Sequence, residues 1–175
     1  MEKDWTRGYV QVYTGDGKGK TTAAFGLALR AAGAGLRVFI AQFVKGMEYS
    51  ELRALERFDE IEVRRYGRDC FIQREPEPAD VEAARAGLSE ARKELASGEW
   101  DVVIFDEANI ATYFELFSVD ELLAVIAQKP DDVELVITGR RADPRVIEVA
   151  DLVTEMREVK HYYEQGVPCR RGIEH

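Results

Sequence analysis

A glycine- and lysine-rich run at residues 15–21, with the sequence GDGKGKT, holds the residue types most suited to binding an anion. Because glycine lacks a Cβ, successive backbone N–H groups can turn inward and surround a phosphate. The ammonium of Lys20 supplies a full charge to phosphate oxygens, and the hydroxyl of Thr21 suits Mg²⁺. The run therefore predicts a Walker A phosphate loop. The residues expected to contact ATP in it are Gly15, Asp16, Gly17, Lys18, Gly19, Lys20, Thr21 and Thr22.

Two residues distinguish this loop from the general pattern. That pattern begins with a glycine, and Thr14 stands in its place. Lys18 adds a second cation, which either helps to hold a polyphosphate tail or is simply solvated. A plain glycine-rich turn has no use for the sequence Gly-Lys-Thr, so phosphate binding is the expected role.

A pair of acids, Asp106 and Glu107, ends the apolar run DVVIFD. An apolar strand that ends in an acid is common and by itself marks only a solvated loop. With a phosphate loop in the same chain, a carboxylate at this place is expected to complete the Mg²⁺ shell, as in a Walker B motif. We therefore predict that Thr21, Asp106 and Glu107 form the metal site, and the residues leave open which acid binds the ion.

Two arginines, Arg140 and Arg141, follow another apolar run, VELVIT. A guanidinium group binds phosphate oxygens in bidentate fashion, so Arg140 is expected to contact ATP. For Arg141, a solvated position at a helix entry is nearly as good an interpretation. Lys20, Thr21 and Glu107 are expected to be catalytic. Like the two arginines, they would lie where the chain leaves a strand.

Apolar runs of strand length alternate with helical patterns along the chain. Residues 67–78 form a polar stretch with two prolines, which predicts a functional loop or lid. A capping box at residues 118–121 (SVDE) predicts a helix start. The expected strands are 9–14, 37–43, 61–66, 101–106, 133–138 and 152–157, and the expected helices are 21–34, 51–58, 79–97, 119–128 and 144–150.

This alternation predicts an α/β fold of three layers, with a mostly parallel six-stranded sheet between helices. Ligands of such sheets lie at the carboxyl ends of the strands. The length of 175 residues fits one domain, which we expect to cover residues 1–175.

The composition excludes several classes of function. The formal charge of -9 and the pI near 4.9 argue against nucleic acid as a partner. The amino terminus has no apolar signal core, and no apolar run approaches the roughly 20 residues needed to cross a bilayer. Only Cys70 and Cys169 occur, too few for a disulfide scaffold. A cytoplasmic protein with free thiols and no membrane association is expected.

The run from Tyr13 to Gly26 closely resembles the ATP:corrinoid adenosyltransferases of the CobA type, whose loop also has threonine in place of the first Walker glycine. Further stretches look like the same family in the same order. They are Gln42-Phe43-Val44-Lys45-Gly46, Asp106-Glu107, Val136-Ile137-Thr138-Gly139-Arg140, Val159-Lys160-His161, Gly166-Val167 and Gly172-Ile173-Glu174.

The resemblance implies a P-loop NTPase (RecA-like) fold and a specific reaction. The family transfers the 5′-deoxyadenosyl group of ATP to Co(I) of a corrinoid, cobalamin or a precursor, and releases triphosphate. Because Co(I) is itself a strong nucleophile, no serine, cysteine or general base is needed for the attack. ATP with Mg²⁺, a corrinoid substrate, an electron-donating reductase and a homodimer are implied in the same way.

The corrinoid side of the site follows the family pattern less closely. The family loop that excludes axial cobalt ligands commonly reads glycine, aromatic, polar, aromatic, whereas this chain has Gly67-Arg68-Asp69-Cys70-Phe71. Phe71 is the best candidate for corrinoid binding, and core packing or a lid contact is an equally good interpretation. Family members with a longer amino-terminal arm use it to cover the site, whereas here only eight residues precede the first expected strand.

Two other classes of function compete with adenosyl transfer. The first is a RecA-like P-loop ATPase or kinase that cleaves the γ-phosphate, for which Glu107 would serve as the base. The second is a nucleotide sensor or DNA-associated module without catalysis, against which the acidic composition counts. Triphosphate as the product would indicate adenosyl transfer, and ADP would indicate the first alternative.

Overall fold

The computed structural model describes residues 3–44, 50–67 and 76–174. Six parallel strands form one sheet in the order β3-β2-β4-β5-β1-β6. The strands are β1 (Val10–Thr14), β2 (Val38–Gln42), β3 (Ile61–Arg65), β4 (Val102–Asp106), β5 (Glu134–Thr138) and β6 (Leu152–Glu155). The parallel α/β fold predicted from the sequence is confirmed.

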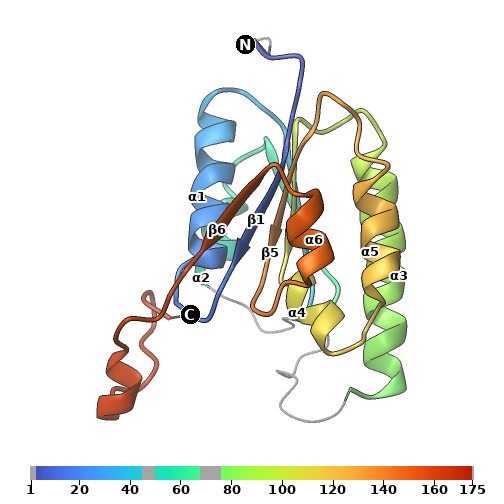
Figure 1. Cartoon of the computed structure of the whole chain (residues 1–175). Helices are drawn as coiled ribbons and strands as arrows, with labels where there is room; N and C mark the ends of the chain where they lie inside the picture. Colours follow the sequence, from blue (N-terminus) through green and yellow to red (C-terminus); the bar gives the residue numbers. More distant parts are fainter. Residues whose placement is uncertain (1–2, 45–49, 68–75, 175) are drawn as a thin grey trace.

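Helices cover both faces of this sheet and make the three layers visible in Figure 1. One face carries α1 (Lys20–Gly33) and α2 (Ser50–Leu55). The opposite face carries α3 (Pro78–Leu95), α4 (Ala108–Tyr113), α5 (Val119–Ile126) and α6 (Pro144–Val149). A short 3₁₀ helix, η1 (Tyr162–Gln165), lies in the carboxyl-terminal segment, which extends away from the sheet beyond α1.

The central strands are apolar throughout because both of their faces are covered. In β2, Val38 and Ile40 pack into the core beneath α1 and α2, whereas Phe39 and Ala41 pack beneath the helices of the other face. This two-sided burial explains the continuous apolar runs in the sequence. All six strands run in one direction, so their carboxyl ends meet at one edge of the sheet, the lower edge in Figure 1.

The predicted helices and strands are present, and their ends differ from the expected ones by at most three residues. The predicted capping box is confirmed, because Ser118 Oγ accepts from the N–H of Glu121 at 3.1 Å and Glu121 Oε2 accepts from the N–H of Ser118 at 2.7 Å. The short helices α4 and η1 were not predicted. Strand β6 ends at Glu155 and not at residue 157, because the Met156 carbonyl turns toward Gly17.

Two sequence-based expectations concern residues that lie outside the described part of the chain. Phe71, the candidate for corrinoid binding, and Cys70 both fall in the gap at 68–75, as do most residues of the predicted loop or lid. Cys169 is an exposed free thiol. Within the described ranges, none of the helices is both long and apolar enough to span a bilayer.

Candidate nucleotide-binding site

The phosphate loop connects β1 to α1 at the carboxyl edge of the sheet. Its backbone has positive φ values at Gly15 (93°) and Gly19 (120°), a conformation that residues with a Cβ rarely adopt. Helix α1 begins at Lys20, directly after the second of these glycines. The first N–H groups of the helix and its partial positive charge therefore lie at the loop, as anion binding requires.

The segment that follows β6 supports this loop from one side. The Met156 carbonyl accepts from the N–H of Gly17 at 2.7 Å, and the Met156 N–H donates to the Thr14 carbonyl at 2.8 Å. A Cβ at Gly15 or at Gly17 would lie 2.5 or 2.6 Å from the Met156 oxygen, closer than such atoms ever approach. The two glycines thus permit a close backbone contact in addition to turning the chain.

The threonine that replaces the first Walker glycine, Thr14, makes a contact that a glycine could not make. Its side chain is buried, and its hydroxyl accepts a hydrogen bond of 3.3 Å from the backbone N–H of Ala142. Ala142 belongs to the loop that follows β5. A glycine at position 14 has no atom for this contact, so the threonine links the phosphate loop to the neighbouring strand end.

Lys20 lies at the centre of the loop and is only 7% exposed. Its Nζ donates to the carbonyl oxygens of Gly15 and Gly17, both at 2.7 Å. The ammonium group is therefore held by the backbone of the loop. From the sequence we expected the ammonium of Lys20 to contact phosphate oxygens. The structure shows that it also braces the loop.

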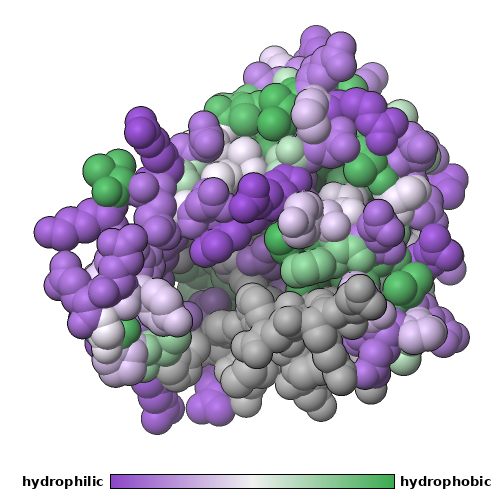
Figure 2. Space-filling model, turned by 60° about the horizontal axis from the view of Figure 1, so that its bottom comes forward, coloured by the Kyte–Doolittle hydropathy of each residue, from purple (hydrophilic) through white to green (hydrophobic). Residues whose placement is uncertain are grey.

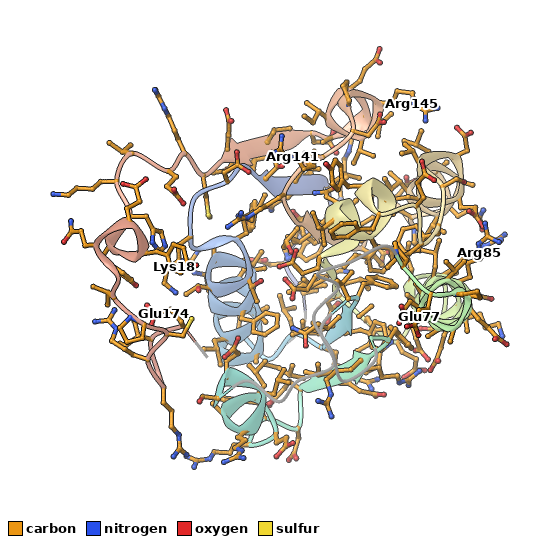
Figure 3. All side chains as sticks on the ribbon, turned by 90° about the horizontal axis from the view of Figure 1, so that it is seen from below. Lys18, Glu77, Arg85, Arg141, Arg145 and Glu174 are labelled. Carbon is orange, nitrogen blue, oxygen red and sulfur yellow. The ribbon has the colours of Figure 1, made fainter. Side chains whose placement is uncertain are left out.

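Lys18 contacts the carboxyl-terminal segment. Its Nζ donates to the Ile173 carbonyl at 2.8 Å, and Figure 3 shows Lys18 on the side of the molecule where Glu174 lies. Glu174 is in turn bonded to Arg170 and to Tyr162, and these contacts, with that of Arg170 the stronger, lower its pKa to about 2. Lys18 is thus neither wholly solvated nor directed into the loop.

The remaining residues predicted for the loop, Asp16 and Thr22, are exposed. Figure 2 looks toward the carboxyl edge of the sheet and shows the surface hollowed between the carboxyl-terminal segment and the rest of the molecule. The phosphate loop lies at this edge of the sheet.

Asp106 joins the phosphate loop to the end of the central strand β4. Its carboxylate is fully buried at the end of β4, and Oδ1 accepts from the hydroxyl of Thr21 at 2.8 Å. The same oxygen accepts from Thr138 Oγ1 at 2.7 Å, and Oδ2 accepts from Gln42 Nε2 at 2.9 Å. Strand β5 separates β4 from β1, so this contact between the two motifs spans more than one strand.

Glu107 occupies a different environment from Asp106. Its backbone has φ of 62°, in the left-handed region, and its N–H donates to Thr138 Oγ1 at 3.0 Å. It precedes the first residue of α4. Of the two acids, Asp106 is the one whose carboxylate contacts Thr21.

The oxygen donors at this place suit Mg²⁺. This ion prefers carboxylate, hydroxyl and phosphate oxygens and retains several water ligands. The Thr21 hydroxyl and the Asp106 carboxylate lie side by side at the phosphate loop, and Gln42 Oε1 is a buried acceptor with no hydrogen-bond partner among the described residues. Within those residues no cluster of three or more His, Cys, Asp or Glu side chains exists to hold a metal without the nucleotide.

Arg140 and Arg141 have different surroundings in the structure. Arg140 is exposed directly after Gly139 at the end of β5, where it can reach an anion at the carboxyl edge. Arg141 lies over the ring of Tyr113 with its Cζ 5.9 Å from the ring centre, and its backbone φ is 59°. The surface position considered for Arg141 fits this contact.

Sequence reasoning did not assign roles to Gln42, Thr138 and Met156. The first two were noticed only as parts of family-like stretches, and Met156 gave no signal at all. Their contacts join residues far apart in the chain, so no local sequence pattern predicts these contacts.

Comparison with known protein families agrees with this geometry. The profile described as ATP:corrinoid adenosyltransferase BtuR/CobO/CobP matches residues 6–175. The chain belongs to this family. Among curated adenosyltransferases, the corrinoid adenosyltransferase of Pseudomonas aeruginosa is 36% identical over 170 residues, covering 96% of this chain and 84% of the relative.

Two further adenosyltransferases are similarly close. The corrinoid adenosyltransferase of Escherichia coli K12 is 34% identical, and corrinoid adenosyltransferase CobA of Salmonella typhimurium is 33% identical. Each alignment covers 97% of this chain and 86% of the relative. The resemblance seen in the motifs is confirmed, and membership of the adenosyltransferase family does not favour the alternative of γ-phosphate cleavage.

Proposed function

We propose that this protein transfers the 5′-deoxyadenosyl group of ATP to the Co(I) centre of a corrinoid and releases inorganic triphosphate. The observation that carries the proposal is the contact of Thr21 with Asp106, which joins the phosphate loop and the acid of β4 into one site. Family membership supplies the chemistry that such a site performs here.

The protein's main task in this reaction is to stabilise the leaving group. The Co–C bond forms with the electron pair of Co(I) while the bond between C5′ and the triphosphate oxygen breaks, and that oxygen takes the electrons. Negative charge on the triphosphate therefore grows in the transition state. Three kinds of group would stabilise this charge. They are the N–H groups of the loop, the ammonium of Lys20 and the guanidinium of Arg140.

Thr21 and Asp106 are the residues that we expect to hold Mg²⁺ against the triphosphate, with Glu107 as a weaker candidate. When bound, the ion would neutralise charge on the phosphate oxygens. Asp106 Oδ1 already accepts two hydroxyl hydrogen bonds, so Asp106 is better suited to orient Thr21 and metal-bound water than to surround the ion by itself.

No general base takes part in this proposal. Co(I) carries the electron pair that attacks C5′, so no proton has to be removed from the nucleophile. The loop N–H groups, Lys20 and Arg140 are hydrogen-bond donors and cations. Such groups stabilise a negatively charged leaving group, whereas activation of a nucleophile would require a base. We assign Glu107 to the neighbourhood of the metal and not to proton transfer.

Several parts of the proposal depend on the family resemblance or on the length and composition of the sequence. They are corrinoid binding by Phe71, delivery of the electron by a reductase, assembly as a homodimer, one domain over residues 1–175 and a cytoplasmic location. Size-exclusion chromatography with light scattering tests the dimer. A Phe71→Ala variant tests the contact with the corrinoid.

The direct test combines the protein with Mg-ATP and a chemically reduced corrinoid. We expect the optical change of Co–C bond formation and one triphosphate released for each alkylated corrinoid. ADP and orthophosphate without an alkylated corrinoid would refute adenosyl transfer and favour the ATPase or kinase. Comparison of cobalamin with cobinamide as acceptors then defines the substrate.

A further inference from the structure

Thr138 connects Asp106 at the end of β4 with the next residue, Glu107, through one buried hydroxyl group. Its Oγ1 lies 2.7 Å from Asp106 Oδ1 and 3.0 Å from the backbone nitrogen of Glu107. The N–H of Glu107 only donates, so the hydroxyl accepts there and points its own proton at the carboxylate. The side chain is fully buried, and both of its hydrogen bonds therefore form away from solvent.

The backbone around Thr138 places the hydroxyl at this position. Gly139 has φ of 131°, and a Cβ there would lie 2.9 Å from the nitrogen of Ile110 and 3.0 Å from Asn109 Cβ. The end of β5 is thus packed directly against the start of α4. This close approach brings Thr138 beside the turn at which β4 ends.

Gln42 holds the other oxygen of the same carboxylate. Its Nε2 donates to Asp106 Oδ2 at 2.9 Å, and its side chain is also fully buried. The carboxylate only accepts, so the amide must present its nitrogen to Asp106 and its Oε1 elsewhere. Donors from β2, from β5 and from Thr21 of α1 therefore fix Asp106 from three directions.

We propose that Thr138, assisted by Gln42, is a positioning residue that holds Asp106 against Thr21 and fixes the turn at Glu107, thereby setting the metal-binding geometry. This inference rests on the proposed use of Mg-ATP. Neither residue has to touch the nucleotide for this role. Buried partners that orient metal-binding groups typically change metal affinity by about 10–100-fold when they are removed.

The test measures Mn²⁺ binding in the presence of ATP by electron paramagnetic resonance, without any corrinoid. Thr138→Val removes the hydroxyl and keeps the shape, whereas Thr138→Ser keeps the hydroxyl. We expect Thr138→Val to weaken Mn²⁺ binding by about 10–100-fold. Thr138→Ser should restore binding to within about threefold of the wild type, since the oxygen that orients the carboxylate is retained.

Thr112→Val is the matched control. Thr112 is also buried, and its hydroxyl donates to the Asn109 carbonyl at 2.8 Å, within α4 and not to the acids. It should lower the melting temperature without weakening Mn²⁺ binding. Equal losses in Thr112→Val and Thr138→Val would show a merely structural role and overturn the proposal.

Gln42→Met is the second variant and keeps the proposal testable if Thr138→Val fails to fold. It removes the opposite donor to Asp106 and should weaken Mn²⁺ binding in the same direction. Wild-type Mn²⁺ affinity in Gln42→Met and in any folded Thr138→Val would overturn the inference. A wild-type protein that binds Mn-ATP normally and forms no alkylcobalt would refute the proposed function alone.

Discussion

The Met156 carbonyl accepts a hydrogen bond of 2.7 Å from the N–H of Gly17, so the chain leaving β6 holds the phosphate loop in place. The Gly17 N–H is therefore bonded within the protein and is not available to an anion. We therefore expect an anion to be bound by the N–H groups that follow Gly17, up to the first turn of α1. All four residues of the edge strand β6 are exposed. We attribute the pairing of β6 with β1 partly to the contact between Met156 and Gly17.

The first prediction concerns Gly17→Ala. The added Cβ would lie 2.6 Å from the Met156 oxygen and 2.9 Å from the Arg157 carbonyl carbon, both backbone atoms that cannot move without displacing the segment. We expect ATP affinity to fall by at least about tenfold, which corresponds to about 1.4 kcal/mol. Isothermal titration calorimetry with Mg-ATP measures the change.

Gly26→Ala is the control for this variant. Gly26 lies in α1 with no atom within 4 Å of an added Cβ, and alanine there should stabilise the helix by about 0.5–1 kcal/mol. ATP affinity should not change. If Gly17→Ala bound ATP as tightly as Gly26→Ala, the contact with Met156 would have no part in shaping the loop.

The second prediction concerns Lys20→Ala. Loss of the central ammonium removes a charge from the leaving triphosphate, and turnover should fall by at least about 100-fold. Because Lys20 also donates to Gly15 and Gly17, the melting temperature should fall as well. Adenosylation rates and thermal melts, taken on the same preparation, separate the two effects.

Lys18→Ala serves for comparison. Its ammonium is bonded to the Ile173 carbonyl at the exposed rim, so turnover should fall far less than in Lys20→Ala. A larger loss in Lys18→Ala than in Lys20→Ala would reverse the roles that we assign to the two lysines.

The third prediction decides between the two acids. Asp106→Asn removes the charge beside Thr21, and the apparent Mg²⁺ affinity should fall by about 10–100-fold, as when a group that orients metal-bound water is lost. Glu107→Gln should cause a smaller loss. Titration of adenosylation with Mg²⁺ at saturating ATP gives both values, and the opposite order would assign the metal to Glu107.

The fourth prediction concerns the pH dependence of the cap of α5. The pKa of Glu121 is lowered mainly by the hydrogen bond from the backbone N–H of Ser118, so the folded state favours the ionised carboxylate. Its contribution to stability is complete above the unfolded pKa of about 4.3 and is lost as the pH falls through the lower folded pKa.

Glu121→Gln should therefore destabilise the protein at neutral pH, and the difference from the wild type should shrink in acid. Urea unfolding at several pH values measures it. A difference that stays constant across the acid range would show that the charge of Glu121 does not contribute. Ser118→Ala, which removes the other half of the cap, should cost about 1 kcal/mol at neutral pH.

Local patterns were sufficient to predict most of the fold. Two-sided burial left continuous apolar runs at β2 and β4, and the capping box at Ser118 marked the start of α5. Helix α4 was missed because it has only six residues and follows a residue, Glu107, in a left-handed conformation. That conformation is stabilised by Thr138, which lies far along the chain.

The sequence by itself determined the phosphate loop, the parallel α/β fold and the family, because glycine spacing, strand-length apolar runs and motif order are all local properties. Only the tertiary structure decided that Asp106 contacts Thr21, that Thr138 and Gln42 fix its carboxylate, and that Met156 supports Gly17. Each of these contacts joins different strands or helices. Their partners are chosen by the strand order and register of the sheet, which no spacing along the chain encodes.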